Sequence, residues 1–270
     1  MIKVAYILSL YDGEKPSYFV RAMESILKQV VEPNVVIRIY VGVDGEINDS
    51  LNKVLETYKN KYYKLIESTE NIGLGAMLNL IIKNLEDEDF IFRMDTDDIC
   101  LKDRTQLQLS YFHENPECLA LGASMYEIDG FEQVVGFKLA HRYATMGSMK
   151  YYRNPFNHPT MALRRIFFDR VGVYDDSLRK AQDYELWLRA LSLGIVMENL
   201  EIPLLKFRVD KNFHLKRSSK ENIMIEFKVA LGFLYRERKL FYLPILIIKS
   251  FVRVLPSRVV RLFYSIVRSH

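Results

Sequence analysis

The chain has 270 residues, of which 49% are hydrophobic and 27% charged, so it can bury a large core, and disorder is excluded for most of it. Cys100 and Cys118 are its only cysteines, which argues against a disulfide framework or a cysteine zinc site and favours a reducing compartment. The formal net charge is +4, but residues 217–270 hold 11 Lys and Arg against three Glu, an excess of eight positive charges. The basic charge therefore belongs to the C-terminal tail.

The first hundred residues alternate between apolar runs and stretches of helical periodicity. Strands are predicted over residues 4–10, 35–43, 63–67 and 90–94, and helices over residues 18–27, 51–58 and 76–85. The first strand runs into Tyr11 without a small-residue cleavage site, so we do not interpret it as a signal peptide. Strand-then-helix units indicate an α/β fold with a mostly parallel central sheet flanked by helices.

The second part of the chain continues with mixed elements. We predict helices over residues 103–113, 166–171 and 181–191, strands over 119–126 and 161–163, and a loop-rich stretch between those two strands.

An acidic cluster follows the fourth strand, where the apolar run ends in Asp95, Asp97 and Asp98. Alternate residues of a strand share a face, so Asp95 and Asp97 are expected to point the same way. Two nearby carboxylates repel each other unless a proton or a cation lies between them, and hard oxygen ligands suit Mg²⁺ or Mn²⁺. The alternative is a polar turn in which one aspartate caps the next helix.

Polar residues stand at the ends of three predicted parallel strands, namely Tyr11, Asp44 and Asp95. Ligands of such sheets bind beyond the carboxyl ends of the strands. This agreement favours a ligand site over a simple polar turn. A further acidic residue, Asp183, begins the helix predicted over residues 181–191, where the alternative is a helix N-cap.

Five segments, in order and at matching intervals, resemble family 2 glycosyltransferases of the kind that builds bacterial surface polysaccharides. They are residues 4–11, 43–45, 71–79 and 93–98, and the pair 157–160 with 182–189. The resemblance implies a GT-A fold and a nucleotide-diphosphate sugar donor. We expect a glycosyltransferase domain over residues 1–215, with a nucleotide-binding part over about 1–100 and an acceptor and catalytic part over about 101–215. A basic amphipathic helical tail over 216–270 follows.

The resemblance also implies roles for single residues. Tyr11 stacks on the base, Asp44 accepts from a base N–H, and Asp95 faces the ribose. Asp97 holds the divalent cation, Mn²⁺ or Mg²⁺, with Asp95 beside it. Asp183 is the general base that deprotonates an acceptor hydroxyl as it attacks the anomeric carbon, so the configuration inverts.

Other residues complete the predicted site. Asn71 and Gly73 are expected to bind the nucleotide sugar, and the sequence Gly73-Leu74-Gly75 after Asn71 predicts a tight turn whose backbone approaches the nucleotide or, alternatively, a plain helix-entry loop. The nucleotide-sugar site also includes Arg93 and Arg208, the latter as a diphosphate contact, and His214 is a candidate third metal ligand. Two acceptor-side residues are predicted in addition, His158 and Trp187. The alternative for Trp187 is a place in the core.

The tail combines basic residues with apolar ones. Residues 223–235 have helical periodicity, and residues 240–248 are uncharged but too short for the roughly 20 residues of a spanning helix. Basic residues then interrupt the apolar sequence up to residue 268, a pattern typical of a helix lying on an anionic membrane surface. It favours this partner over nucleic acid. The alternative is an ordinary packing helix with a solvated basic face.

These observations predict an inverting glycosyltransferase that is cytoplasmic and bound peripherally at the inner face of the cell membrane. It would move a hexose or N-acetylhexosamine, from a UDP-sugar, to a lipid-linked saccharide in O-antigen, capsule or exopolysaccharide assembly. The alternatives are another nucleotide-sugar-using enzyme such as a nucleotidyltransferase, or a non-catalytic nucleotide-sugar-binding relative. A nucleotidyltransferase would usually carry a glycine-rich basic loop after the first strand, and the sequence Leu10 to Lys15 has little of that.

Overall fold

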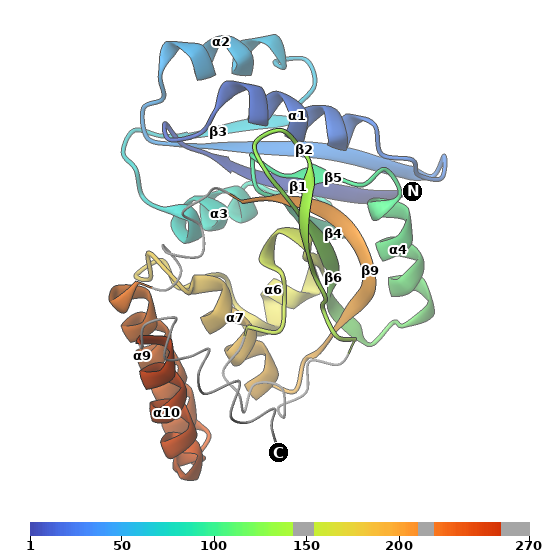
Figure 1. Ribbon diagram of the computed structural model, residues 1–270. Helices are drawn as coiled ribbons and strands as arrows, with labels where there is room; N and C mark the ends of the chain where they lie inside the picture. The colour runs from blue at the N-terminus through green and yellow to red at the C-terminus, as the bar shows by residue number, and fades with distance from the viewer. Residues whose placement is uncertain (143–153, 210–218, 255–270) are drawn as a thin grey trace.

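The computed structural model describes residues 1–142, 154–209 and 219–254. Figure 1 shows a sheet with helices on both faces and a helical hairpin at one side. The strands are β1 (Ile2–Leu10), β2 (Val35–Asp44), β3 (Lys64–Ser68), β4 (Phe90–Arg93), β5 (Ile99–Cys100), β6 (Cys118–Ile128), β7 (Val134–Lys138), β8 (Ala162–Arg164) and β9 (Val196–Arg208). The helices are α1 (Pro16–Leu27), α2 (Asp49–Thr57), α3 (Leu74–Lys83), α4 (Arg104–Glu114), α6 (Ile166–Val171), α7 (Gln182–Ser192), α9 (Lys220–Arg236) and α10 (Leu243–Val254).

The sheet has the order β3-β2-β1-β4-β8-β6-β9-β5, with β7 paired to β6. The first four of these strands are parallel, as the sequence predicted. In the other half, β8 runs antiparallel to both β4 and β6, while β6 and β9 are parallel. The sheet is therefore mixed, and only the half formed by β3, β2, β1 and β4 is wholly parallel.

Alternation along the strands divides the core into two layers. On one face of β1, Tyr6 and Leu8 belong to the apolar cluster that also contains residues of α1 and α2. On the other face, Ala5 and Ile7 belong to the cluster that contains residues of α3, α6 and α7. Helices cover both faces of the sheet. Because β1 pairs in parallel with both β2 and β4, the carboxyl ends of the three strands meet at one edge.

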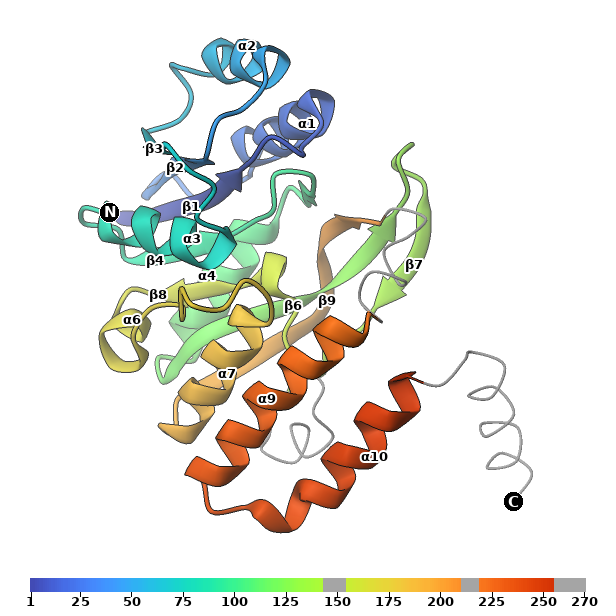
Figure 2. The same ribbon diagram turned by 90° about the vertical axis from the view of Figure 1, so that its left-hand side faces the viewer.

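The tail packs on the domain through α9. Figure 2 shows α9 beside α7, with α10 folded back beside α9. Tyr184 and Leu188 of α7 share one apolar cluster with Phe233 and Leu234 of α9, and Leu246 joins the cluster from α10. In the described part of the chain, no helix is both long enough and apolar enough to cross a membrane.

Candidate active site

The acidic turn that the sequence predicted lies at the end of β4. The chain leaves β4 at Arg93 and passes through Asp95, Asp97 and Asp98 before β5. One carboxylate oxygen from each of the three aspartates lies within 4.8 Å of the others. The three aspartates follow the end of β4 and precede β5, so the sheet holds both ends of the turn in place. The arrangement brings together the predicted cation ligands Asp95 and Asp97 and adds Asp98 to them.

Arg93 orients Asp95. The residue is 2% exposed, and Nη1 donates to Asp95 Oδ2 at 2.7 Å while Nη2 donates to Asp95 Oδ1. Such a two-pronged ion pair fixes the carboxylate in direction as well as in place. The prediction that Arg93 contacts the nucleotide sugar directly is therefore wrong, because the side chain is buried. Its role is to hold Asp95 in position.

Arg208 braces the turn from the end of β9. Its backbone N–H donates to Asp98 Oδ1 at 2.9 Å, and its Nε–H donates to the Asp97 carbonyl at 2.9 Å. The guanidinium also stacks on Tyr18, 3.9 Å from the ring centroid, and the residue is 6% exposed. The predicted diphosphate contact of Arg208 is thus corrected as well, because its guanidinium is buried among groups of the protein.

The electrostatics of the turn show mutual repulsion. Burial, with the charge of Asp95 added, raises the pKa of Asp97 to about 6. Burial and the neighbouring carboxylates also hold the pKa of Asp98 well above its usual range. Asp98 Oδ2 is buried and has no hydrogen-bond partner among the described residues. Each of these features costs free energy, which a cation between the carboxylates would offset.

Glu14 is a fourth carboxylate beside the turn, and sequence reasoning missed it. Burial and the charges of Asp97 and Asp95 raise its pKa to about 8, although a hydrogen bond with Thr96 opposes the shift. Glu14 belongs to the loop between β1 and α1, far from the aspartates in sequence. Only the parallel pairing of β1 with β4 brings the two segments together, so no local pattern could have indicated it.

The site fits a divalent cation by its donors. Three aspartate carboxylates converge, one of their buried oxygens lacks a partner among the described residues, and the carboxyl group of Glu14 lies beside them. Such a set of oxygen ligands is what Mg²⁺ or Mn²⁺ requires. The third predicted metal ligand, His214, lies outside the described residues.

The predicted nucleotide loop is held by Asp44. The carboxylate of Asp44 accepts from the backbone N–H of Ile72 at 2.6 Å and from that of Gly73 at 3.0 Å. The Asn71 side chain donates to the Asp44 carbonyl at 3.2 Å, which ties the loop to the end of β2. Asp44 therefore shapes the loop that leads into α3. Its contact with the base stays a prediction.

Tyr11 stands at the end of β1 with 45% of its surface exposed. Its ring lies so close to Gly13 that a Cβ atom there would overlap it. An exposed aromatic ring at the ligand edge of the sheet is suited to stacking on a base, as the sequence predicted. That role stays a prediction too.

Asp183 lies in the first turn of α7, where Asn154 Nδ2 donates to Asp183 Oδ2 at 2.6 Å. The N-cap of α7 is Ala181, so the helix-cap alternative for Asp183 is wrong. The buried Tyr174 lies within the field of both Asp183 and Asp95, whose charges, after burial itself, help to raise its pKa. The predicted base and an aspartate of the acidic turn therefore both lie near the same tyrosine.

The two predicted acceptor-side residues lie in the core. Trp187 is fully buried against Phe156, His158 and Phe167, so the acceptor-stacking prediction for it is wrong and the core alternative is confirmed. His158 Nε2 lies 2.8 Å from the Tyr174 hydroxyl. Burial and the charge of Arg93 lower the pKa of His158 well below its usual value, so the ring is neutral. Its direct contact with an acceptor stays a prediction.

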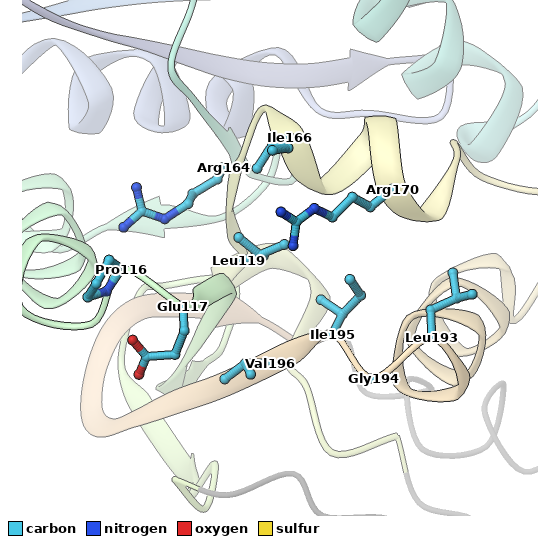
Figure 3. A pocket seen from close by; sticks show the side chains of 10 residues that line it. All are labelled: Pro116, Glu117, Leu119, Arg164, Ile166, Arg170, Leu193, Gly194, Ile195 and Val196. Atoms are coloured by element: carbon cyan, nitrogen blue, oxygen red, sulfur yellow. The ribbon is translucent and has the colours of Figure 1, made fainter.

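A separate hollow of about 600 Å³ lies at the opposite edge of the sheet, among residues that Figure 3 labels. Its lining includes Glu117 and Val196, next to the starts of β6 and β9. Arg208, which braces the acidic turn, lies at the other end of β9. The hollow is therefore not part of the candidate active site.

The fold and the site define an α/β class of protein with an acidic turn suited to a cation at the carboxyl ends of its parallel strands, and comparison with known proteins gives the family. The chain matches the profile of glycosyl transferase family 2 over residues 7–172. It belongs to this family and is a glycosyltransferase. The prediction made from the five sequence segments is confirmed.

Two curated relatives cover nearly the whole chain. The amylovoran biosynthesis glycosyltransferase AmsE of Erwinia amylovora is 32% identical over 96% of this chain and 97% of its own length. A UDP-Gal:alpha-D-GlcNAc-diphosphoundecaprenol beta-1,3-galactosyltransferase of Escherichia coli is 29% identical over 94% of this chain and 92% of its own.

Among solved structures, residues 1–349 of TarS from S. aureus, in complex with UDP-GlcNAc, match with a TM-score of 0.65. This match covers 96% of the present chain and 83% of that chain at 18% identity. A likeness at this identity shows the fold, which is the predicted GT-A fold.

Proposed function

We propose that the enzyme transfers a hexose or N-acetylhexosamine from a UDP-sugar to a hydroxyl of a lipid-linked saccharide, in the assembly of a surface polysaccharide. The main support is that Asp183 and Asp95, an aspartate of the acidic turn, both lie close enough to Tyr174 for their charges to act on it. An inverting transfer needs a base on the acceptor side and a charge-balancing group on the donor side. Relatives named for amylovoran biosynthesis and for a diphosphoundecaprenol acceptor support the substrate classes.

In the proposed reaction, Asp183 takes the proton from the acceptor hydroxyl as its oxygen attacks the anomeric carbon. The hydrogen bond from Asn154 holds the Asp183 carboxylate in one orientation. On the donor side, Asp97, Asp95 and Asp98 would hold the divalent cation, and Arg93 keeps Asp95 oriented for it. When bound, the cation supplies positive charge against the departing diphosphate.

We further propose that the tail attaches the enzyme peripherally to the cytoplasmic face of the cell membrane. The α10 helix has large apolar side chains on its exposed surface, among them Ile248 at 63% and Phe251 at 64% exposure. The sequence after α10 adds Arg258, Arg261 and Arg268. Apolar groups and basic groups together suit an anionic bilayer surface, where a lipid-linked acceptor would lie.

Calorimetry tests the donor and cation parts of this proposal. UDP-sugars are titrated into the enzyme with Mn²⁺ and again with excess chelator. We expect one UDP-sugar to bind with Mn²⁺ and its affinity to collapse with chelator, because the diphosphate loses its counter-ion. An affinity that is unchanged in chelator would show that donor binding needs no cation, and would contradict the proposed cation site.

A further inference from the structure

The donor diphosphate requires cationic hydrogen-bond donors that a ligand can reach. Arg93 and Arg208, the two arginines of the predicted site, do not meet this requirement because both are buried and bonded within the protein. A guanidinium that recognises a diphosphate must keep free N–H groups on an accessible surface.

Arg179 precedes α7 in the chain and contacts the predicted nucleotide loop at Asn71, and its side chain is exposed. Its Nη1 donates to Asn71 Oδ1 and its Nη2 donates to the Asn71 carbonyl, both at 3.1 Å. Asn71 is itself tied to Asp44, at the end of β2. The loop that the sequence assigns to the nucleotide therefore fixes the Arg179 guanidinium while leaving it at the surface.

Gly73 permits this position. Its φ of +91° is one that a side chain rarely allows, and a Cβ atom there would lie 2.7 Å from Arg179 Nη1. The guanidinium thus packs directly over the backbone at the start of α3. The loop is built around Arg179 in two ways, through the bonds of Asn71 and through the missing side chain of Gly73.

Arg179 also belongs to the segment that leads into α7 and Asp183. Between the two stands Ala181, whose φ of +59° is left-handed and unusual for a residue other than glycine. Such strain persists where the surrounding structure enforces it, often at functional sites. Through its hydrogen bonds to Asn71, Arg179 links the predicted nucleotide loop to the segment that leads into α7, the helix that carries the proposed base.

We propose that Arg179 binds the diphosphate of the UDP-sugar donor through the N–H groups that Asn71 leaves unused. This assignment rests on the proposed function. It makes one cation both a donor contact and the link between the nucleotide loop and the catalytic helix.

Binding of UDP and of uridine, with Mn²⁺ present, tests the assignment in the full-length enzyme. Arg179→Gln should weaken UDP binding by about 10-fold or more, because a charge-assisted hydrogen bond is lost, and should leave uridine binding within about twofold. Arg179→Lys keeps the charge without the two-pronged geometry, so its affinity for UDP should lie between that of the wild-type enzyme and that of Arg179→Gln. Lys180→Gln is the matched control, because Lys180 pairs at the surface with Glu221 at 2.8 Å; it should bind both ligands normally.

Two results would overturn the assignment. Equal weakening of UDP and uridine by Arg179→Gln would show that the side chain only shapes the loop, and unchanged UDP binding would show that it has no part in the site. Both leave the proposed function standing. A wild-type enzyme that binds no UDP would instead overturn the proposed function and this assignment with it.

Discussion

At the scale of single residues, the dominant feature is a concentration of carboxyl groups whose burial and mutual repulsion raise the pKa of several of them. The pKa values of Glu14 and Asp97 are raised to about 8 and about 6, from ordinary values of 4.5 and 3.8. A carboxyl group whose pKa is higher in the folded state binds more protons there than in the unfolded chain. The stability that protonation provides is therefore lost as the pH rises through the folded pKa values.

We expect the melting temperature of the metal-free enzyme to fall as the pH rises from about 5 to about 8, the window that these two shifts define. Mn²⁺ should raise the melting temperature more at pH 8 than at pH 5, because ionised carboxylates bind it better. Glu14→Gln should flatten the pH dependence of the metal-free enzyme, since it removes the titration with a pKa of about 8. Melting curves across this range, with and without Mn²⁺, measure all three effects. A wild-type profile as flat as that of Glu14→Gln would contradict the account.

Residues that follow strand ends were predictable from sequence, whereas residues that depend on tertiary contacts were not. Asp95 and Asp97 could be found because a strand pattern ends at them. Glu14 and Arg179 carry no such pattern, since their neighbours are supplied by β4 and by the loop at Asn71. The arginines 93 and 208 were assigned to the ligand because sequence does not reveal which charges become buried.

At the scale of elements, the strands of the parallel half were predictable and β9 was not. β9 contains Glu198, Glu201 and Pro203, which interrupt the alternation that marks a half-buried strand. Its pairing with β6 includes register shifts, so the strand is stabilised by a distant partner rather than by its own pattern. This missed strand delivers Arg208 to the acidic turn.

The helices of the tail differ in what they contact, and a matched pair of variants separates their roles. Phe233 of α9 is buried against α7, which carries the proposed base, whereas Phe251 of α10 is exposed. Phe233→Ala should destabilise the enzyme by about 3–5 kcal/mol, as large core truncations do, and should slow transfer to a water-soluble acceptor by disturbing α7. Phe251→Ala should leave melting and soluble transfer unchanged but reduce cosedimentation with anionic vesicles.

Vesicle cosedimentation and soluble transfer, measured on both variants, check this division. Salt should weaken vesicle binding by screening the basic residues, while the apolar contribution persists. If the wild-type enzyme never cosediments, α10 is a packing element only. If Phe233→Ala transfers normally while folded, α9 does not support the catalytic helix.

At the scale of the whole molecule, the tail is continuous with the catalytic domain. The sequence predicted a helical tail from residue 216, and α9 begins near there, but its apolar face is buried on α7. The curated relatives from Erwinia amylovora and Escherichia coli match over 96% and 94% of the chain, so their likeness extends into the tail. Sequence periodicity showed that the helices were amphipathic, but it could not show which partner their apolar faces meet.

The central claim is that Asp183 is the base of a transfer reaction whose donor is held at the acidic turn. Its most direct test measures donor binding and transfer to a lipid-linked saccharide for Asp183→Asn and Asp97→Ala, on protein shown to be folded. Asp183→Asn should retain Mn²⁺-dependent donor binding and slow transfer by about 10² to 10⁴, the usual contribution of a positioned general base. Asp97→Ala should weaken donor binding and transfer together. A folded Asp183→Asn enzyme that transfers at a near-normal rate would contradict the account.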